Sequence, residues 1–386
     1  MSKMPIYLDN QATTPCDPRV VAAMLPWFTE HPGNPHSAEH AMGHAAATAV
    51  EVARAEIAAL IGADPREIVL TSGATEANNL AIKGAARFAA VQETTRRRVV
   101  TVATEHKCVL ESVLELRHEG FEPVVLPVGP DGLLDLAVLR AALVVPTLLV
   151  SVMVANNEIG VLQDIRAVAE LAHAAGAMLH SDAAQAAGKI TLDVAALGVD
   201  LMSLTAHKVY GPKGVGALFV RRRPRARVLP LFSGGGQERG MRSGTLATPQ
   251  VVGFGEAARI ACAELTVDAA QARDLRERLW DGLCERVPGV TINGDVGKRL
   301  PGSLNVTFPR AAALDLMRMA PELCVSTGSA CSSAAIEPSY VLRAIGLDAA
   351  AAGRTLRFGI GRFTSATDVD HAVSALADAH HTLSPD

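Results

Sequence analysis

Residues 67–76 read EIVLTSGATE, an apolar run that ends in a Ser-Gly pair and continues directly into a helical pattern. An uninterrupted Ile/Val/Leu run of this kind is typical of a parallel strand that is covered on both faces. In such a strand–turn–helix unit, the N–H groups that begin the helix face an anion beyond the carboxyl edge of the sheet. The stretch therefore predicts an α/β unit with a candidate phosphate seat, although such a turn, taken alone, more often reflects ordinary helix capping.

The same alternation of apolar runs and amphipathic stretches continues through most of the chain. It predicts further strands over residues 98–103, 123–128, 148–154, 177–181, 201–204 and 216–220, and helices over residues 43–61, 76–89, 109–119 and 165–175. Because strands alternate with helices and no internal repeat is present, we expect an α/β fold with a mostly parallel, doubly wound sheet.

The pattern changes after about residue 260. A long charged helix over residues 272–286 and short alternating segments such as 303–308 predict a smaller α+β domain, with which the extreme N-terminus is expected to pack. We therefore expect a large domain over residues 15–260 and a small domain formed by residues 1–14 and 261–386. No Pro/Gly/Ser linker marks the boundary.

Composition and charge exclude several classes of protein. Of the 386 residues, 49% are hydrophobic and 20% are charged, which is typical of a globular enzyme and not of a disordered chain. A formal net charge of −4 argues against binding to a nucleic-acid backbone. The start of the chain lacks the apolar core of a secretory signal, and the most apolar run, residues 141–155, is too short for a membrane span, so we expect a cytoplasmic protein. The six cysteines include no Cys-x-x-Cys pair, which fits neither a zinc ribbon nor a disulfide scaffold.

Three side chains that can carry chemistry follow two predicted strands at the point where each strand ends. LHSDAAQ (179–185) carries Asp182 and Gln185, and SLTAHK (203–208) ends in Lys208. Together they place a carboxylate, an amide and a lysine at one sheet edge, beside the phosphate seat. Pyridoxal phosphate requires a lysine for its aldehyde, a carboxylate for its pyridinium nitrogen and an amide for its phenolate oxygen. Taken separately, Asp182 is as well explained as a helix cap and Lys208 as a surface residue.

With these residues the sequence resembles the cysteine desulfurases of the NifS/IscS type, which belong to the aminotransferase-like, fold type I enzymes that use pyridoxal phosphate. The resemblance covers nearly the whole chain. It rests on YLDNQATTP (7–15), GNP (33–35), TSGATE (71–76), TEHK (104–107), NNEIG (156–160), AHKVYGPKG (206–214), GGGQERGMRSGT (234–245), STGSACS (326–332) and RFGIGRF (357–363). It implies the aminotransferase-like fold, a homodimer and pyridoxal 5′-phosphate as the cofactor.

The resemblance also implies roles for the residues around the cofactor. Lys208 would be the Schiff-base lysine and would move the Cα proton of the substrate, and Asp182 would keep the ring nitrogen protonated. His106 would stack on the pyridine ring and take part in proton transfer, and Gln185 would hydrogen-bond the phenolate oxygen.

Two further groups of residues are implied to hold the phosphate and the substrate. The phosphate would be bound by Ala74, Thr75, Thr205 and His207, with Thr245 reaching it from the neighbouring subunit. The substrate carboxylate would pair with Arg357, helped by Asn34 and by Asn157, which also contacts the cofactor.

Cys331 is the residue on which the implied activity depends. It lies in a Ser/Thr/Gly stretch, which predicts an exposed, mobile loop over about residues 324–336, whereas Cys324 fits a buried position. The resemblance implies that the Cys331 thiolate attacks the sulfur of bound L-cysteine and leaves an enzyme persulfide and L-alanine. The sulfur would then pass to a scaffold or other acceptor protein for iron–sulfur cluster assembly. No metal site is expected, apart from a transient contact of Cys331 with a nascent cluster.

Three alternatives stay open at this point. A selenocysteine lyase, or another lyase of this fold, would use the same cofactor residues, although the TGSAC stretch (327–331) differs from the RxGHHC pattern of the branch that includes selenocysteine lyases. A sulfur carrier or assembly platform could keep the fold without the cofactor, but intact Lys208, Asp182 and His106 argue against it. A cofactor-free acyl-transfer enzyme built on Cys331 and His106 would leave the lysine unexplained. The identity of the acceptor, and a nitrogen-fixation as opposed to a housekeeping role, also stay open.

Two further patterns are given ordinary interpretations. His36, His40 and His44 recur every four residues, but proline and glycine interrupt the stretch and no metal site is expected there. RRRPRAR (221–227) follows a predicted strand of an acidic protein and contains no aromatic residue, which predicts a solvated turn and not a nucleic-acid patch.

Overall fold

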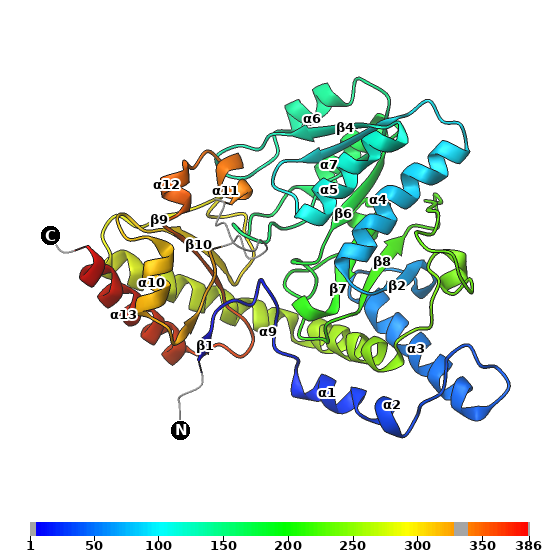
Figure 1. The fold of residues 1–386 in the computed structure, drawn as a ribbon, viewed down its shortest axis with the longest axis horizontal. Helices are drawn as coiled ribbons and strands as arrows, with labels where there is room; N and C mark the ends of the chain where they lie inside the picture. Colours follow the sequence, from blue (N-terminus) through cyan, green and yellow to red (C-terminus); the bar gives the residue numbers. More distant parts are fainter. Residues whose placement is uncertain (1–4, 328–338, 385–386) are drawn as a thin grey trace.

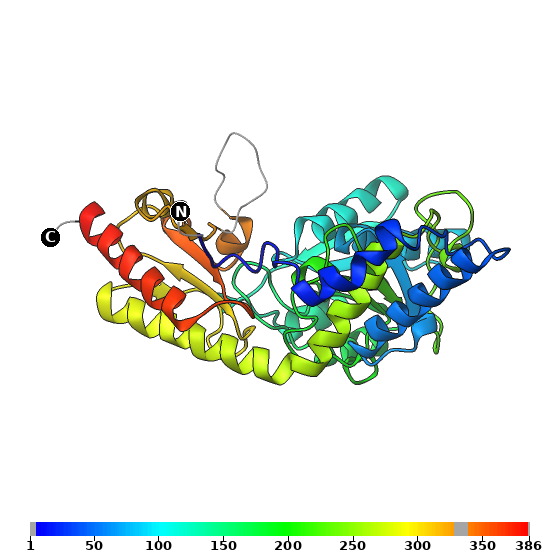
Figure 2. The same cartoon turned by 90° about the horizontal axis from the view of Figure 1, so that it is seen from below.

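The structure is a computed structural model that describes residues 5–327 and 339–384, so Cys331 lies outside the described residues. Two lobes share one long helix, α9 (Thr248–Arg286) (Figure 1). Seen from below, α9 runs beneath both lobes and joins them (Figure 2). Phe254, near the start of α9, belongs to the core of the larger lobe, and Leu279 belongs to the core of the smaller lobe.

Within the described residues, the larger lobe contains a seven-stranded sheet in the order β2-β8-β7-β6-β5-β3-β4. Neighbouring strands are parallel except at β8, which runs antiparallel to β2 and β7. The strands are β2 (Ile68–Thr71), β3 (Arg98–Val102), β4 (Glu122–Leu126), β5 (Thr147–Ser151), β6 (Met178–Asp182), β7 (Leu201–Thr205) and β8 (Gly216–Val220). The mostly parallel, doubly wound sheet is therefore confirmed.

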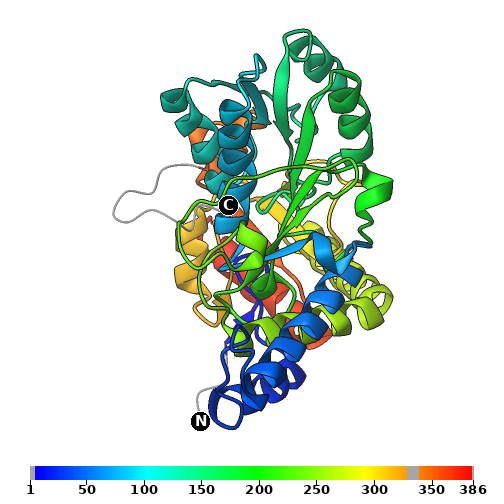
Figure 3. The ribbon, with the colours of Figure 1, turned by 90° about the vertical axis from the view of Figure 1, so that its right-hand side faces the viewer.

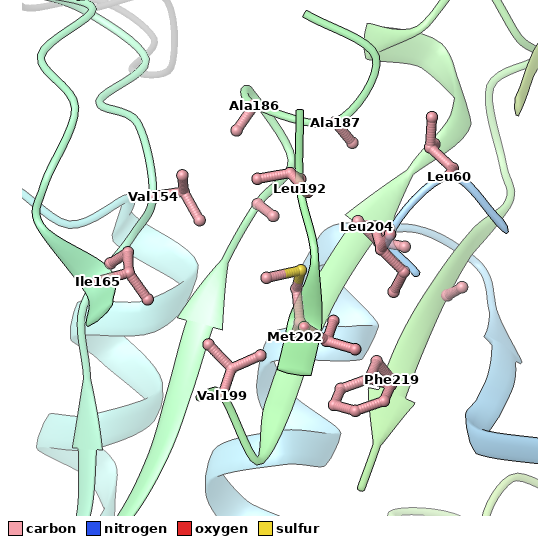
Figure 4. Close-up of a cluster of buried hydrophobic side chains, with 14 of the residues drawn as sticks. Leu60, Val154, Ile165, Ala186, Ala187, Leu192, Val199, Met202, Leu204 and Phe219 are labelled. Atoms are coloured by element: carbon pink, nitrogen blue, oxygen red, sulfur yellow. The ribbon is translucent and has the colours of Figure 1, made fainter. Parts of the chain in front are cut away.

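Helices cover both faces of this sheet (Figure 3). One layer consists of α4 (Ala74–Val91) and α5 (Lys107–Glu115). The opposite layer consists of α3 (Ala41–Ala59), α6 (Leu136–Ala142), α7 (Ile165–Ala174) and the start of α9. Val99 packs in the first layer and Val100 in the second, because neighbouring side chains of a strand point to opposite faces. Figure 4 shows part of the second core, with Met202 of β7 beside Phe219 of β8.

The smaller lobe contains two small sheets in the described part of the chain. β1 (Ile6–Tyr7) pairs in parallel with β11 (Leu323–Cys324). A three-stranded antiparallel sheet has the order β12 (Thr355–Gly359), β10 (Ser303–Thr307) and β9 (Thr291–Ile292). α10 (Ala313–Met319), α13 (Ala366–Leu383) and the second half of α9 pack on these sheets. Leu8 joins the same core, so the N-terminal segment packs with this lobe.

The helix predicted over residues 272–286 is the C-terminal part of α9, which begins at Thr248. The sequence pattern did not predict the first half of α9 because this half contains Gly253 and Gly255, and glycine disfavours helices. The structure gives the physical reason for one of these glycines: a Cβ on Gly255 would lie 2.5 Å from Cα of Ala53, so α3 and α9 touch backbone to backbone there. The proposed domain boundary near residue 260 falls inside this continuous helix and stays a prediction.

Several short elements complete the described residues. They are α1 (Pro18–Met24), α2 (Pro26–Thr29), α8 (Val194–Leu197), α11 (Tyr340–Ala344), α12 (Ala349–Ala352) and the 3₁₀ turns η1 (Pro65–Glu67), η2 (Leu116–Glu119), η3 (Ala206–Lys208) and η4 (Glu238–Gly240). None of the helices in the described ranges combines the length and the apolar character that crossing a membrane requires.

A buried histidine ties three central strands together. His180 of β6 lies between Ser151 Oγ of β5, 2.8 Å from Nδ1, and Ser203 Oγ of β7, 3.0 Å from Nε2. The ring is fully buried, and burial lowers its pKa to about 3. His180 is therefore neutral in the folded protein throughout the physiological range, two residues before the carboxyl end of β6.

We predict that His180 contributes to acid destabilisation. As pH falls below about 6.5, the unfolded chain binds a proton at this histidine and the folded chain does not, so stability is lost at up to about 1.4 kcal/mol per pH unit. His180→Gln should remove this contribution, so its free energy of unfolding, measured in urea between pH 6 and pH 5, should fall less steeply than that of the wild type. The exposed His118→Gln serves as the control. Equal slopes in the wild type and His180→Gln would contradict the prediction.

Candidate active site

A cavity of about 500 Å³ opens at the carboxyl edge of the large sheet. Its volume falls in the range of small-ligand sites. It is lined by most of the residues to which a cofactor role was given: Ala74, Thr75, His106, Asn157, Asp182, Gln185, Thr205, His207 and Lys208. Ser72, Gly73, Cys108, Met153 and Lys213 also contribute to the wall. Because parallel strands end at the same edge, residues far apart in the sequence meet here.

The start of α4 forms one end of the cavity. No side chain caps this helix, whose first residue follows Gly73, so the N–H groups of its first turn are available to an anion. Gly73 has φ +154°, a conformation that residues with a side chain rarely adopt. A Cβ on Gly73 would lie 3.9 Å from Thr205 Oγ1, which places that hydroxyl beside the turn. A phosphate fits these donors.

Asp182 ends β6 and is only 5% exposed. Its Oδ2 accepts a hydrogen bond of 2.6 Å from Asn78 Nδ2, and its Oδ1 accepts one of 2.8 Å from the N–H of Ala184. Two donors thus fix the carboxylate, which suits a protonated ring nitrogen as its further partner. Sequence reasoning missed Asn78, because only the structure shows that this polar residue is buried in the otherwise apolar face of α4.

His106 caps the start of α5 and is exposed to the cavity. Its Nδ1 accepts a hydrogen bond of 3.2 Å from the N–H of Cys108, which leaves the ring proton on Nε2. Crowding by protein atoms lowers the pKa of His106, although the carboxylate of Asp182 acts in the opposite direction. The imidazole is therefore neutral near pH 7. Burial raises the pKa of the neighbouring Cys108 thiol to about 12, so this thiol is not a nucleophile at that pH.

Lys208 and Gln185 meet at one backbone oxygen. The carbonyl of Gln11 accepts hydrogen bonds from Lys208 Nζ and, at 2.8 Å, from Gln185 Nε2. His207 Nδ1 lies 3.1 Å from Thr13 Oγ1, and burial together with nearby lysines lowers the pKa of His207 to about 4. His207 is therefore neutral, and the N-terminal segment that carries Gln11 and Thr13 forms part of the site.

Of the predicted site residues that the structure describes, three do not line this cavity. Arg357 is 3% exposed and donates to Asp9 Oδ1 at 2.7 Å and to the carbonyl of Asn157 at 3.0 Å. Asn34 is exposed and accepts a hydrogen bond of 2.9 Å from the N–H of His36 in its own loop. Thr245 is exposed, in the segment that carries Arg242, and Arg242 forms an ion pair of 2.8 Å with Glu76 at the start of α4.

The residues of the wall fit pyridoxal phosphate. The start of α4 and Thr205 suit its phosphate, Asp182 suits its ring nitrogen, and Lys208 reaches the same cavity. Asn157 Oδ1 is buried and has no partner among the described residues, so an acceptor is left for a bound molecule.

Comparisons with known proteins show which family this chain belongs to. Residues 6–372 match the family described as aminotransferase class-V. The chain is 50% identical over 385 residues to a protein named cysteine desulfurase IscS from Rickettsia rickettsii, with 99% of this chain and 93% of that relative covered. It is 53% identical over 376 residues to the protein of the same name from Methylococcus capsulatus, covering 97% and 92%. A solved structure named NifS-like protein superposes with a TM-score of 0.89 at 35% identity, over 97% of this chain and 99% of that one.

We predict that Gly73→Ala weakens the binding of pyridoxal phosphate about tenfold or more. An alanine strains the turn at φ +154°, and the helix N–H groups then lose their orientation toward the phosphate. The dissociation constant can be measured by fluorescence titration of cofactor-free protein. Gly346→Ala is the matched control, because Gly346 has φ +96° in open space and does not line the cavity. An unchanged constant in Gly73→Ala, or equal losses in both variants, would refute the role of this turn.

Proposed function

We propose that this chain, which belongs to the aminotransferase class-V family and is a pyridoxal-phosphate-dependent cysteine desulfurase, passes the sulfur of L-cysteine to Cys331 and then to an acceptor protein. The observation that carries the proposal is the joint placement of Lys208, Asp182 and His106 in one cavity beside the start of α4. We further propose that it works in the cytoplasm as a homodimer and that the acceptor serves iron–sulfur cluster assembly.

Each wall residue has a separate task toward the bound cofactor. Pyridoxal phosphate, when bound, supplies an electron sink that stabilises negative charge at the substrate Cα. The first turn of α4 and Thr205 would hold the phosphate, and Asp182 would keep a proton on the ring nitrogen. Lys208 would bind the aldehyde and move the proton at the substrate Cα. Neutral His106, with its proton on Nε2, suits proton transfer near pH 7.

Arg357 is the candidate partner of the substrate carboxylate. Its guanidinium is held in place by Asp9 and by the carbonyl of Asn157, and its Nε is buried without a partner among the described residues. A fork of N–H donors of this kind matches a carboxylate. Because Asp9 already occupies one arm of the fork, a substrate carboxylate would have to join or displace Asp9.

Both described ends of the segment that carries Cys331 bond either to Arg357 or to residues next to His106 and Asn157 in the sequence. Ser326 accepts a backbone hydrogen bond of 2.6 Å from the N–H of Arg357. Ser339 Oγ donates to Glu158 Oε2 at 2.5 Å, and the hydroxyl of Tyr340 donates to the carbonyl of Glu105 at 2.7 Å. Cys331 is four residues beyond Thr327, and four residues span at most about 14 Å. This tether supports the proposal that the thiol reaches the bound substrate.

The sulfur step balances without a further oxidant. The thiolate of Cys331 forms an S–S bond with the sulfur of the substrate while the Cβ–S bond of the substrate breaks. The electron pair of the broken bond stays on the carbon, which takes a proton and leaves as L-alanine. The acceptor protein or an added thiol would then reduce the persulfide.

We predict that Cys331→Ala lowers alanine formation from L-cysteine about 1000-fold or more, because no thiolate remains to take the sulfur. Alanine would be measured by chromatography, and the persulfide by mass spectrometry after alkylation. Cys262→Ala, at an exposed position on α9, is the matched control and should keep wild-type rates. Turnover of L-selenocysteine by Cys331→Ala would show that the cofactor chemistry survives. Sustained desulfuration by this variant would rule Cys331 out.

The homodimer is proposed from the position of Thr245. This residue is exposed and does not line the cavity of its own chain, whereas the Arg242–Glu76 ion pair ties its segment to the edge of the cavity. Exposed apolar side chains, including Leu25 at 59%, Phe28 at 54% and Phe232 at 51%, supply surface that a second copy can bury. The partner subunit would thus contribute Thr245 to the phosphate end of the site.

Hybrid dimers test this arrangement. One subunit carries Lys208→Ala and the other carries Thr245→Ala. If Thr245 acts across the interface, the subunit with intact Lys208 receives an intact Thr245, so the hybrid should show about half of the wild-type alanine formation at limiting cofactor. If Thr245 acts within its own chain, the hybrid contains no intact site and should be no better than the Thr245→Ala homodimer. A wild-type protein that sediments as a monomer would refute the dimer itself.

A further inference from the structure

Lys189 is a lysine to which neither the sequence nor the proposed reaction gives a task. It lies between the lobes, where it lines a small cavity of about 40 Å³ together with Gln11, Ser303 and Arg362. Its Nζ donates a hydrogen bond of 3.0 Å to Gln185 Oε1. Gln185 also lines the active-site cavity, so Lys189 is connected to the cofactor pocket through a single hydrogen bond to a residue of its wall.

The chemistry of its neighbours fixes the orientation of the Gln185 amide. A lysine Nζ donates, so the amide oxygen must face Lys189. The carbonyl of Gln11 can only accept, so the amide nitrogen must face the other way, where it donates at 2.8 Å. Lys189 and the Gln11 carbonyl together therefore fix Gln185 so that it presents N–H donors, and not its oxygen, on the side of the active site.

Lys189 itself has no carboxylate partner in the described part of the chain, although some of the charged groups near it are paired. Burial, together with the nearby cations Lys208 and Arg357, lowers the pKa of Lys189 to about 7. Asp268, which also lines the small cavity, forms an ion pair of 2.7 Å with Arg362, so this carboxylate is already engaged. No ion pair joins Lys189 to a carboxylate among the described residues. A buried cation is costly without a counter-charge, and an anionic oxygen beside Gln185 would provide one.

We propose that Lys189 is a positioning residue, which orients the Gln185 amide so that it donates into the active site and favours an anionic phenolate oxygen on the bound pyridoxal phosphate. The identity of the anionic group rests on the proposed function. The orientation of the amide rests on the contacts alone.

Three variants test the proposal on the full-length protein. Lys189→Met removes the donor and the charge at similar length, Lys189→Arg keeps both, and Gln185→Leu removes the amide through which Lys189 would act. Two properties are measured for each: the dissociation constant of pyridoxal phosphate from fluorescence titration, and the pH midpoint of the visible absorbance of the bound cofactor. Thermal unfolding of the cofactor-free proteins reports on stability separately.

We expect Lys189→Met to weaken cofactor binding about tenfold and to raise the pH midpoint by about one unit, because the deprotonated phenolate loses a favourable charge. Lys189→Arg should leave both the dissociation constant and the pH midpoint close to those of the wild type. In a Gln185→Leu background, Lys189→Met should have little further effect on either value, since Lys189 would act on the cofactor through the Gln185 amide.

Two results would overturn the proposal. One is a lower melting temperature in Lys189→Met with unchanged binding and an unchanged midpoint, which would make Lys189 a structural residue only. The other is an equal effect of Lys189→Met on binding and on the pH midpoint in the wild-type and Gln185→Leu backgrounds, which would show that Lys189 does not act through the Gln185 amide. A wild-type protein that develops no visible absorbance with pyridoxal phosphate would instead contradict the proposed function, so the two failures are distinguishable.

Discussion

The hydrogen bond between Asn78 and Asp182, 2.6 Å long, is the contact on which the geometry of the site depends. Asn78 lies four residues beyond Ala74, the first residue of α4, which is about 6 Å along a helix. The same helix therefore offers N–H groups at its start and, one turn later, holds the carboxylate that ends β6. A ligand with a phosphate at one end and a basic nitrogen at the other meets two fixed partners. This explains why α4 packs closely on β6, and why a buried asparagine lies in an otherwise apolar helix face.

Burial controls which groups around this contact carry charge. His106, His180 and His207 all have lowered pKa values because protein atoms replace water around them, so each imidazole is neutral near pH 7. The Cys108 thiol is kept protonated for the same reason. The charged groups that remain near the site include Asp182 and the cations Lys189, Lys208 and Arg357, and the start of α4 adds its partial positive charge. A neutral histidine beside a fixed carboxylate can exchange a proton without creating a second uncompensated charge.

The parts of the site that sequence reasoning could predict are those that follow a strand. Asp182, Lys208 and the Ser-Gly turn before α4 each come directly after an apolar run, and the convergence of parallel strands brings them together without further information. Asn78, Lys189 and the pairing of Arg357 with Asp9 depend on packing between elements far apart in the chain, so no local pattern reveals them. The start of α9 was missed because Gly255 looks unfavourable for a helix until its contact with Ala53 is known. The roles of individual residues, the domain boundary and the reach of Cys331 stay predictions.

The N-terminal segment explains how two lobes make one site. Leu8 packs in the core of the smaller lobe, whereas Thr14 N–H donates at 2.8 Å to the carbonyl of His207 in the larger lobe. Between them, the Gln11 carbonyl receives Lys208 and Gln185, and its side-chain amide donates to Ser303 of β10. Arg357, on the neighbouring strand β12, is held by Asp9 of the same segment. Seven residues thus set the distance between the lysine of one lobe and the arginine of the other. Together with α9, these contacts link the two lobes, so the segment couples the arginine that would bind the substrate carboxylate to the lysine that would move the substrate proton.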